Sequence, residues 1–288
     1  MPESNYRQPI DRLVIFDFSG TLSIQSVVFG TEENLTQALK ESGLWELGLN
    51  STDRFWNEVV NPTWTQGSTT SIGYEKLLTN QISRILQLPL ETVASQVSAF
   101  ARKYFQSFEV YPAWKEVFEE MNQHPGCLIL IATDHYAEAT GWIIRKLQAR
   151  GLAAASVFTD SIQQTELFSI WIANSSDVGY PKASREFWLI LKQRLSLHSV
   201  SLVMVVDDFG FNEQPKDDYS SQEKVRIRQT RQEKILNAVF NCPVRVFKFF
   251  MPDKNWQDWQ TVEQQYRQLI FQVKKFLVAG LNIRQQSK

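Results

Sequence analysis

The sequence predicts a three-layer α/β fold, in which helices cover both faces of a Rossmann-like parallel sheet. Three short, continuous apolar runs favour this fold, at residues 13–16, 127–132 and 202–206. Runs of this length that are rich in branched side chains are typical of strands buried on both faces. Segments with helical periodicity separate the second run from the third, as the crossover connections of a parallel sheet require.

The first apolar run ends in a polar loop. Asp17 follows the run directly, and Ser19, Gly20 and Thr21 come next. Open α/β sheets bind their ligands at the carboxyl ends of the strands, and a glycine allows the backbone to turn sharply there. We therefore expect Asp17 to lie at a functional site.

Residues 24–108 follow a different pattern. Apolar residues recur with helical spacing at 32–42, 53–60, 74–86 and 90–105, whereas turn-forming residues predict a loop at 61–70. About 80 residues of helix are far more than a simple strand–helix–strand crossover needs. We therefore predict a core domain formed by residues 1–23 and 109–288, with residues 24–108 inserted as a helical cap domain.

The alternation of strands and helices resumes after residue 110. Helices are predicted from Pro112 to about 123, from 136 to 150, at 184–195 and at 256–277. Weaker or shorter strands are predicted at 156–159 and 244–249. Residues 161–178 fit either a strand or a buried turn, and residues 214–233 fit a loop followed by a helix with a solvated face.

Composition excludes several classes of partner. The net charge is −1 and there is no long basic run, which argues against a nucleic-acid-binding surface. No apolar run approaches the roughly 20 residues of a membrane span. The two cysteines, Cys127 and Cys242, cannot form a disulfide framework and are expected to be buried. We therefore expect a cytoplasmic protein that uses neither nucleic acid nor membrane.

The three strand ends carry groups that could act together. The second run ends at Thr133, the third at Asp207 and Asp208, and Lys182 stands just before a predicted helix. Converging carboxylates would repel one another and a phosphate unless a divalent cation lay among them. Since Mg²⁺ prefers oxygen ligands and retains several waters, we predict Mg²⁺ as the cofactor.

Such a set of groups suits the transfer of a phosphoryl group to a carboxylate. Asp17 would attack phosphorus in line and form an aspartyl-phosphate, which water then cleaves. The Lys182 ammonium would offset the remaining negative charge, and the Thr133 hydroxyl would donate to a phosphate oxygen.

In order, spacing and position on the predicted elements, these residues resemble the four motifs of the haloacid dehalogenase-like (HAD) superfamily. The resemblance extends from Asp11 to at least Asn212, and residues 24–108 match the helical cap of that superfamily. It implies that Asp17 is the nucleophile and that Thr133 and Lys182 hold the phosphate. The metal ligands that it implies are Asp17, the backbone carbonyl of Ser19, Asp207 and Asp208.

Further phosphate contacts are expected from the residues beside these motifs. Gly20 and Thr21 follow the nucleophile, and the backbone N–H of Asp134 follows Thr133. The neighbouring His135 is expected to be an ordinary loop residue. The lysine motif reads Pro181-Lys182 here, where the superfamily more often has the reverse order.

Ser19 is the main departure from the superfamily. Phosphatases of this kind usually carry a second aspartate at that position, where it protonates the leaving oxygen and later activates water. A serine hydroxyl is far too weak an acid for this role, and such catalysis typically contributes ~10²–10⁴-fold. Ser19 is nevertheless included among the candidate catalytic residues, with Asp17, Thr133 and Lys182.

We therefore predict a Mg²⁺-dependent hydrolase of a small phosphorylated metabolite. One alternative is a catalytically impaired relative that binds a phosphorylated ligand or a protein partner. Another is a phosphonatase-like C–P hydrolase, which needs a Schiff-base lysine; Lys76 is a candidate, although an exposed helix face is the expectation for it. The cap aromatics Trp56, Trp64 and Tyr74 are expected to form a small core rather than to line a pocket.

Overall fold

The computed structural model describes residues 9–159 and 169–282. Its strands are β1 (Arg12–Phe16), β2 (Cys127–Thr133), β3 (Ala154–Ser156), β4 (Ile170–Asn174), β5 (Leu202–Asp207) and β6 (Val244–Lys248). They form one six-stranded sheet in the order β3-β4-β2-β1-β5-β6, and every neighbouring pair is parallel. The predicted parallel α/β fold is confirmed.

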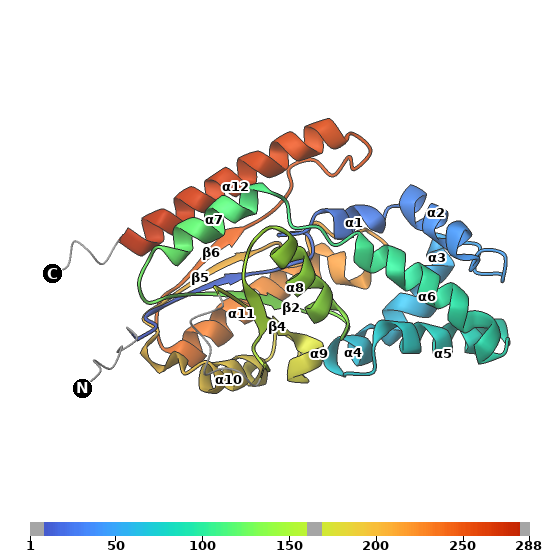
Figure 1. Cartoon of the computed structure of the whole chain (residues 1–288), viewed down its shortest axis with the longest axis horizontal. Coiled ribbons are helices and arrows are strands. Elements are labelled where there is room, and N and C mark those ends of the chain that lie inside the picture. Colours follow the sequence, from blue (N-terminus) through green and yellow to red (C-terminus); the bar gives the residue numbers. More distant parts are fainter. Residues whose placement is uncertain (1–8, 160–168, 283–288) are drawn as a thin grey trace.

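Helices cover both faces of this sheet. On one face lie α7 (Ala113–Asn122), α8 (Ala139–Ala149) and α12 (Trp259–Asn282), and on the other α10 (Arg185–Arg194) and α11 (Gln222–Phe240). Figure 1 shows α7 and α12 on the opposite side of the strands from α10 and α11. The three layers follow from this arrangement.

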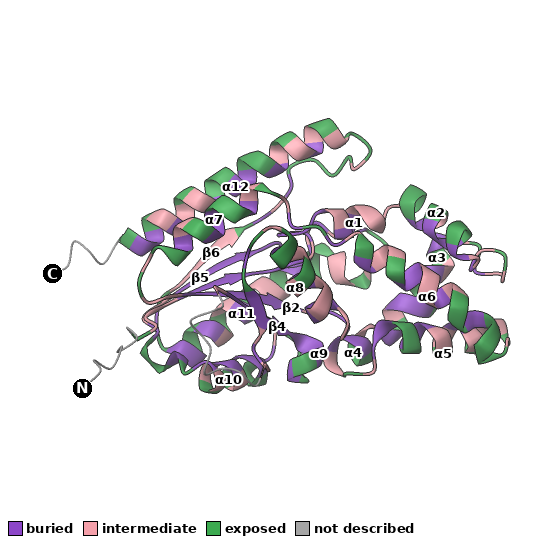
Figure 2. Cartoon of the chain, in the orientation of Figure 1, coloured by how far each residue is buried: buried purple, intermediate pink, exposed green. Residues whose placement is uncertain are grey.

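Alternation along the strands explains why both faces are covered. In β1, Val14 and Phe16 join the core on the α7 side, whereas Leu13 and Ile15 join the core on the α10 side. All four side chains are fully buried, and Figure 2 shows the central strands as buried. A strand without a polar face can only be stable between two layers of helix.

Only helices lie between β1 and α7. They are α1 (Gln25–Phe29), α2 (Glu32–Ser42), α3 (Thr52–Arg54), a π-helical turn (Phe55–Val60), α4 (Asn61–Thr69), α5 (Tyr74–Leu86) and α6 (Leu90–Gln106). In Figure 1 this helical segment lies beyond the ends of the strands. Its helical content agrees with the expectation, whereas its division from the rest as a separate domain stays a prediction.

The predicted loop at residues 61–70 is wrong, because this stretch forms α4. Pro62 falls in the first turn of the helix, where the missing N–H of proline is tolerated. Gly67 lies where α4 meets Tyr136: a Cβ on Gly67 would come within 2.2 Å of the tyrosine ring. Tertiary packing therefore outweighs the turn-forming tendency of these residues.

Three other expectations are refined. Of the ambiguous stretch at 161–178, residues 161–168 lie outside the described residues, and the remainder forms β4 and the short helix α9 (Ser175–Val178). The weak strand expected at 156–159 lies two residues earlier, as β3. The helix expected after the polar loop at 214 is α11, preceded by a 3₁₀ turn, η4 (Asp218–Ser220).

Candidate functional site

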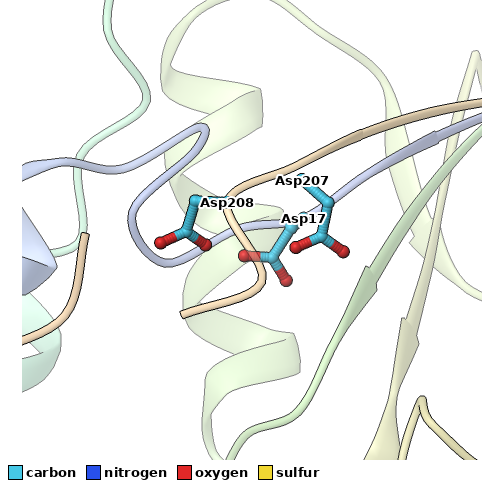
Figure 3. Close-up of side chains that lie close together, drawn as sticks. All are labelled: Asp17, Asp207 and Asp208. Carbon is cyan, nitrogen blue, oxygen red and sulfur yellow. The ribbon is translucent and has the colours of Figure 1, made fainter. Parts of the chain in front are cut away.

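Asp17 lies at the carboxyl end of β1, between the ends of its two neighbours. Its backbone N–H donates to the Val206 carbonyl at 2.9 Å, which extends the pairing of β1 with β5 by one residue. Carboxylate oxygens of Asp17, Asp207 and Asp208 lie within 4.8 Å of one another. Figure 3 shows the three side chains together on these adjacent strand ends.

Lys182 joins this group from the loop before α10. Its Nζ lies 2.5 Å from Asp17 Oδ1 and 2.9 Å from Asp207 Oδ2. The loop is fixed by two bonds to Lys182 itself: its N–H donates to Asp134 Oδ1, and its carbonyl accepts from Trp188 Nε1. Although Lys182 follows Pro181 in reversed order, it still reaches Asp17.

Charge is unbalanced at this site, because one ammonium faces three buried carboxyls. Burial raises the pKa of Asp17, with further rises from Asp207 and Asp208, while Lys182 opposes them. Burial, followed by the charges of Glu213 and Asp207, raises the pKa of Asp208 to about 8. Burial disfavours the Lys182 ammonium, yet Asp17 and Asp207 outweigh it and raise the pKa of Lys182.

The donor set suits a small, hard cation. In an octahedral Mg²⁺ site with bonds of 2.0–2.1 Å, opposite ligand oxygens are at most about 4.2 Å apart. Carboxylate oxygens that all lie within 4.8 Å of one another are therefore close enough to share one cation, directly or with a bridging water at one of them. The predicted role of the Ser19 carbonyl stays a prediction.

Asp208 is oriented by the backbone on two sides. Its Oδ1 accepts from Gly210 N and its Oδ2 from Asn212 N, while its own N–H donates to Thr21 Oγ1. Asn212 was not anticipated from the sequence. Its side-chain amide donates to the carbonyls of Gly20 and Phe249, so it ties the β1 loop to the end of β6.

Gly20 and Thr21 shape the loop after Asp17. Gly20 has φ +72°, and a Cβ there would come within 2.7 Å of Asp208 Oδ2. Thr21 is fully buried and its hydroxyl is bonded to Asp208 N. Among the described residues neither belongs to the lining of the cavity beside Asp17, and their predicted contacts with phosphate stay predictions.

Thr133 ends β2 on the other side of Asp17, and Asp134 follows it directly. Thr133 is buried, and both residues line the cavity that Asp17 faces. The Asp134 carboxylate accepts from Lys182 N at 2.7 Å and from the Tyr219 hydroxyl at 3.2 Å. Asp134 therefore positions the lysine loop, a role that the sequence did not suggest.

Ser19 contacts a carboxyl that sequence reasoning missed. Its hydroxyl donates to Glu213 Oε1 at 2.7 Å and also lies 3.0 Å from the Ser26 hydroxyl. Burial, followed by the charge of Asp217, raises the pKa of Glu213 to about 8. Glu213 belongs to the polar stretch after β5, where nothing in its spacing distinguished it from solvated acidic neighbours.

The cavity beside Asp17 extends from the strand ends into the helical segment. Its aromatic lining residues are Phe29, Phe55, Trp56, Trp64, Tyr74, Phe100, Tyr104, Tyr136 and Tyr219. Trp56, Trp64 and Tyr74 thus line a pocket, and the expectation that they only form a core is wrong. They are also packed with the main core, because the cavity is cut into that core.

His135 is not an ordinary loop residue, since it is buried among aromatic rings. Its Nδ1 accepts from Tyr136 N, and its Nε2 lies 2.9 Å from the Tyr104 hydroxyl. Burial lowers the pKa of His135 to about 3, so the ring is neutral and carries its proton on Nε2. Tyr104 therefore accepts from His135 and keeps its own hydrogen for a group in the cavity.

Lys76 lies on an exposed face of α5. It does not line the cavity with Asp17, where Lys182 is the sole lysine among the described lining residues. This position agrees with the expectation that Lys76 lies on an exposed helix face.

A polar loop at residues 213–220 connects the strand ends with the helical segment. Lys216 Nζ forms ion pairs with Glu32 and Asp53, and its carbonyl accepts from the Asn61 side-chain amide. The same loop carries Glu213, Asp217 and Tyr219 on the cavity wall. We call it the clasp loop.

The chain was compared with known proteins by sequence and by structure. No family model and no curated protein matches the sequence. Among solved structures, a HAD family enzyme from Bacteroides thetaiotaomicron is similar at 10% identity, over 89% of this chain and 99% of that one, with a TM-score of 0.45.

The fold is an all-parallel α/β fold, and the candidate site lies at the carboxyl ends of its strands. An all-parallel sheet carries the four motif positions at the ends of β1, β2 and β5 and in the loop before α10. The described residues also hold a buried acidic group suited to a cation. Among residues 9–159 and 169–282, no helix has both the length and the apolar character needed to cross a bilayer.

Proposed function

We propose that this protein is a Mg²⁺-dependent hydrolase of a small phosphate monoester, acting through an aspartyl-phosphate on Asp17. The observation that carries the proposal is the contact of Lys182 with Asp17 and Asp207, beside the third carboxylate of Asp208. A site that only bound phosphate would not place three carboxyls where the anion must lie. Asp17, Asp207 and Asp208 would hold the Mg²⁺, which would neutralise negative charge on the phosphate.

The residues of the chain account for the remaining steps. Asp17 Oδ would form the bond to phosphorus as the ester oxygen leaves, and Lys182 and Thr133 would bind the other phosphate oxygens. The leaving oxygen needs a proton, which Ser19 alone is too weak an acid to supply. Glu213, the carboxyl in contact with Ser19, would supply it.

The contact between Ser19 and Glu213 favours an enzyme over the impaired, ligand-binding alternative. It gives the site a second carboxyl near the position where the superfamily has its aspartate. The C–P hydrolase alternative is not favoured, because its lysine candidate, Lys76, is exposed and outside the cavity.

The test is hydrolysis of 4-nitrophenyl phosphate, whose leaving group needs no acid. We expect turnover with Mg²⁺, loss of turnover with a chelator, and its abolition in Asp17→Asn. Asp253→Asn is a matched control, because Asp253 is exposed and an asparagine can still accept from Asn255 N. Turnover that survives Asp17→Asn would sink the assignment, and tight phosphate binding without turnover would support the ligand-binding alternative.

A further inference from the structure

The cavity beside Asp17 has two chemically different ends. At one end lie Asp17, Lys182, Asp207 and Asp208, the groups assigned above to the phosphate. The other end reaches α4 and α6, and its walls are mostly aromatic. The group attached to the phosphate must therefore lie against aromatic rings.

Charge on the walls limits what this group can be. Besides the phosphate end, the lining includes the carboxyls of Asp134, Glu213 and Asp217. Lys182 is the sole cationic side chain among the described lining residues, and it is already paired with Asp17 and Asp207. A second anionic group on the substrate would meet repulsion and find no partner.

Two aromatic residues meet beside one of these carboxyls. Trp64 of α4 and Tyr219 of the clasp loop have ring centroids 5.8 Å apart, at an interplanar angle of 67°. Asp217 lies two residues before Tyr219, and its Oδ1 accepts from Tyr219 N, which leaves Oδ2 for another donor. Arg228 already lies over the Tyr219 ring, 3.5 Å from its centroid. The Trp64 ring and the Asp217 carboxylate are therefore the groups that would attract a further cation, through the ring quadrupole and through direct charge.

The size of the cavity sets a further limit. Its volume is ≈ 80 Å³, and since a single water needs roughly 10–15 Å³ on the same measure, only a small substrate fits. The leaving group is therefore short as well as free of negative charge.

From these features we infer that the substrate is a phosphate monoester whose short leaving group carries an ammonium cation. The phosphate binds at Asp17 and Lys182, and the ammonium lies near Trp64 and Asp217. This inference rests on the proposed phosphatase function and specifies its substrate class.

Three esters of equal length separate the possibilities: 2-aminoethyl phosphate, n-propyl phosphate and carboxymethyl phosphate. They place a cation, a neutral group and an anion at the same distance from phosphorus. We expect kcat/KM for the cationic ester to exceed that for the neutral ester about 10-fold, as cation–π attraction joined to a carboxylate predicts. The anionic ester should be the poorest substrate.

Equal or better hydrolysis of the neutral ester would overturn the inference, and so would a preference for the anionic one. These failures are distinct from failure of the proposed function, which 4-nitrophenyl phosphate reports. If that ester is hydrolysed and the cationic ester is not preferred, only the substrate class is wrong. If no ester is hydrolysed, the phosphatase assignment itself fails.

Two variants locate the ammonium. Trp64→Leu and Asp217→Asn should each lower the ratio of kcat/KM for the cationic over the neutral ester by about 3- to 10-fold. Matched controls are Phe271→Leu, a 56% exposed phenylalanine on α12, and Asp253→Asn. A ratio that stays at the wild-type value in both site variants, with unchanged thermal unfolding, would overturn the placement.

Discussion

Ser19 shows how a single residue can be misjudged from the sequence. Without a neighbour, its hydroxyl is a poor replacement for a carboxylic acid, and the site would lack a proton donor. The structure places Glu213 2.7 Å from that hydroxyl, although 194 positions separate the two residues in the chain. No local pattern reports such a pair, because it depends on how the loop after β5 returns to the loop after β1.

Replacement of Glu213 tests its part in proton transfer. In Glu213→Gln we expect kcat/KM for an alkyl phosphate to fall by ~10²–10⁴-fold, with a much smaller loss for 4-nitrophenyl phosphate. The reason is that only the alkyl leaving group needs protonation. Steady-state kinetics on both esters provide the measurement, with exposed Glu186→Gln as the control.

Adding Ser19→Asp to Glu213→Gln should restore part of the lost alkyl-phosphate activity. Ser19→Asp alone would place a second carboxyl against Glu213 and should gain less. Equal losses on both esters in Glu213→Gln would contradict a role in proton transfer and indicate a structural one.

Helix α4 shows what a local reading of an element can miss. Asn61, Pro62 and Gly67 are turn-forming residues, yet they lie in a helix that contributes Trp64 to the cavity. Gly67 allows α4 to approach Tyr136 closely, and that contact joins elements far apart in the chain. By contrast, apolar residues at helical spacing predict both α7 and its buried face, because that pattern lies within one short segment of the chain. The buried residues of α7 are those predicted: Trp114, Val117, Phe118 and Met121.

The variant Gly67→Ala tests how much the close contact between α4 and Tyr136 contributes to stability. Alanine favours a helix by up to about 1 kcal/mol, but a Cβ here would overlap the Tyr136 ring. We expect Gly67→Ala to lower the free energy of unfolding by about 1–3 kcal/mol, as overpacking does. Chemical denaturation of the variant and the wild type measures this difference in the free energy of unfolding.

Gly141→Ala in α8 is the matched control for Gly67→Ala. A Cβ on Gly141 would meet only Arg145 Nη1, at 3.6 Å. Since the helix gains and nothing overlaps, we expect this variant to be more stable by about 0.5–1 kcal/mol. Equal stabilisation of both variants would show that α4 and Tyr136 can separate without cost.

At the scale of the whole molecule, more of the fold than of the site could be predicted from the sequence. Asp17, Thr133 and Asp207 lie at the ends of buried parallel strands. Such strands can be recognised in a sequence as continuous apolar runs. Their convergence follows from sheet geometry alone. The walls of the cavity depend instead on how the helical segment and the clasp loop pack over the sheet. That packing cannot be predicted from any local sequence pattern.

The stability of the metal-free protein should depend on pH through the carboxyl group of Asp208. The pKa of Asp208 is raised to about 8 in the folded state, so between about pH 4 and pH 8 the folded protein holds a proton that the unfolded chain releases. The free energy of unfolding therefore falls as pH rises through that window. Mg²⁺ bound to these carboxyls, as proposed, would replace the proton, so its stabilising effect should be larger at pH 8 than at pH 5.

Thermal unfolding in chelator and in Mg²⁺, across this range, measures the effect. Asp208→Asn should weaken both the pH dependence and the response to Mg²⁺. A Mg²⁺ effect that is the same at pH 5 and pH 8 would contradict the assignment of the cation to these carboxyls.

The clasp loop has a consequence for how the protein responds to ionic strength. Lys216 is 40% exposed on its side chain, and its ion pairs with Glu32 and Asp53 lie in solvent, where salt screens them. The same short loop carries Asp217 and Tyr219. Raising the salt concentration should therefore loosen the hold on the substrate before it disturbs the chemistry, so KM should rise while kcat changes little.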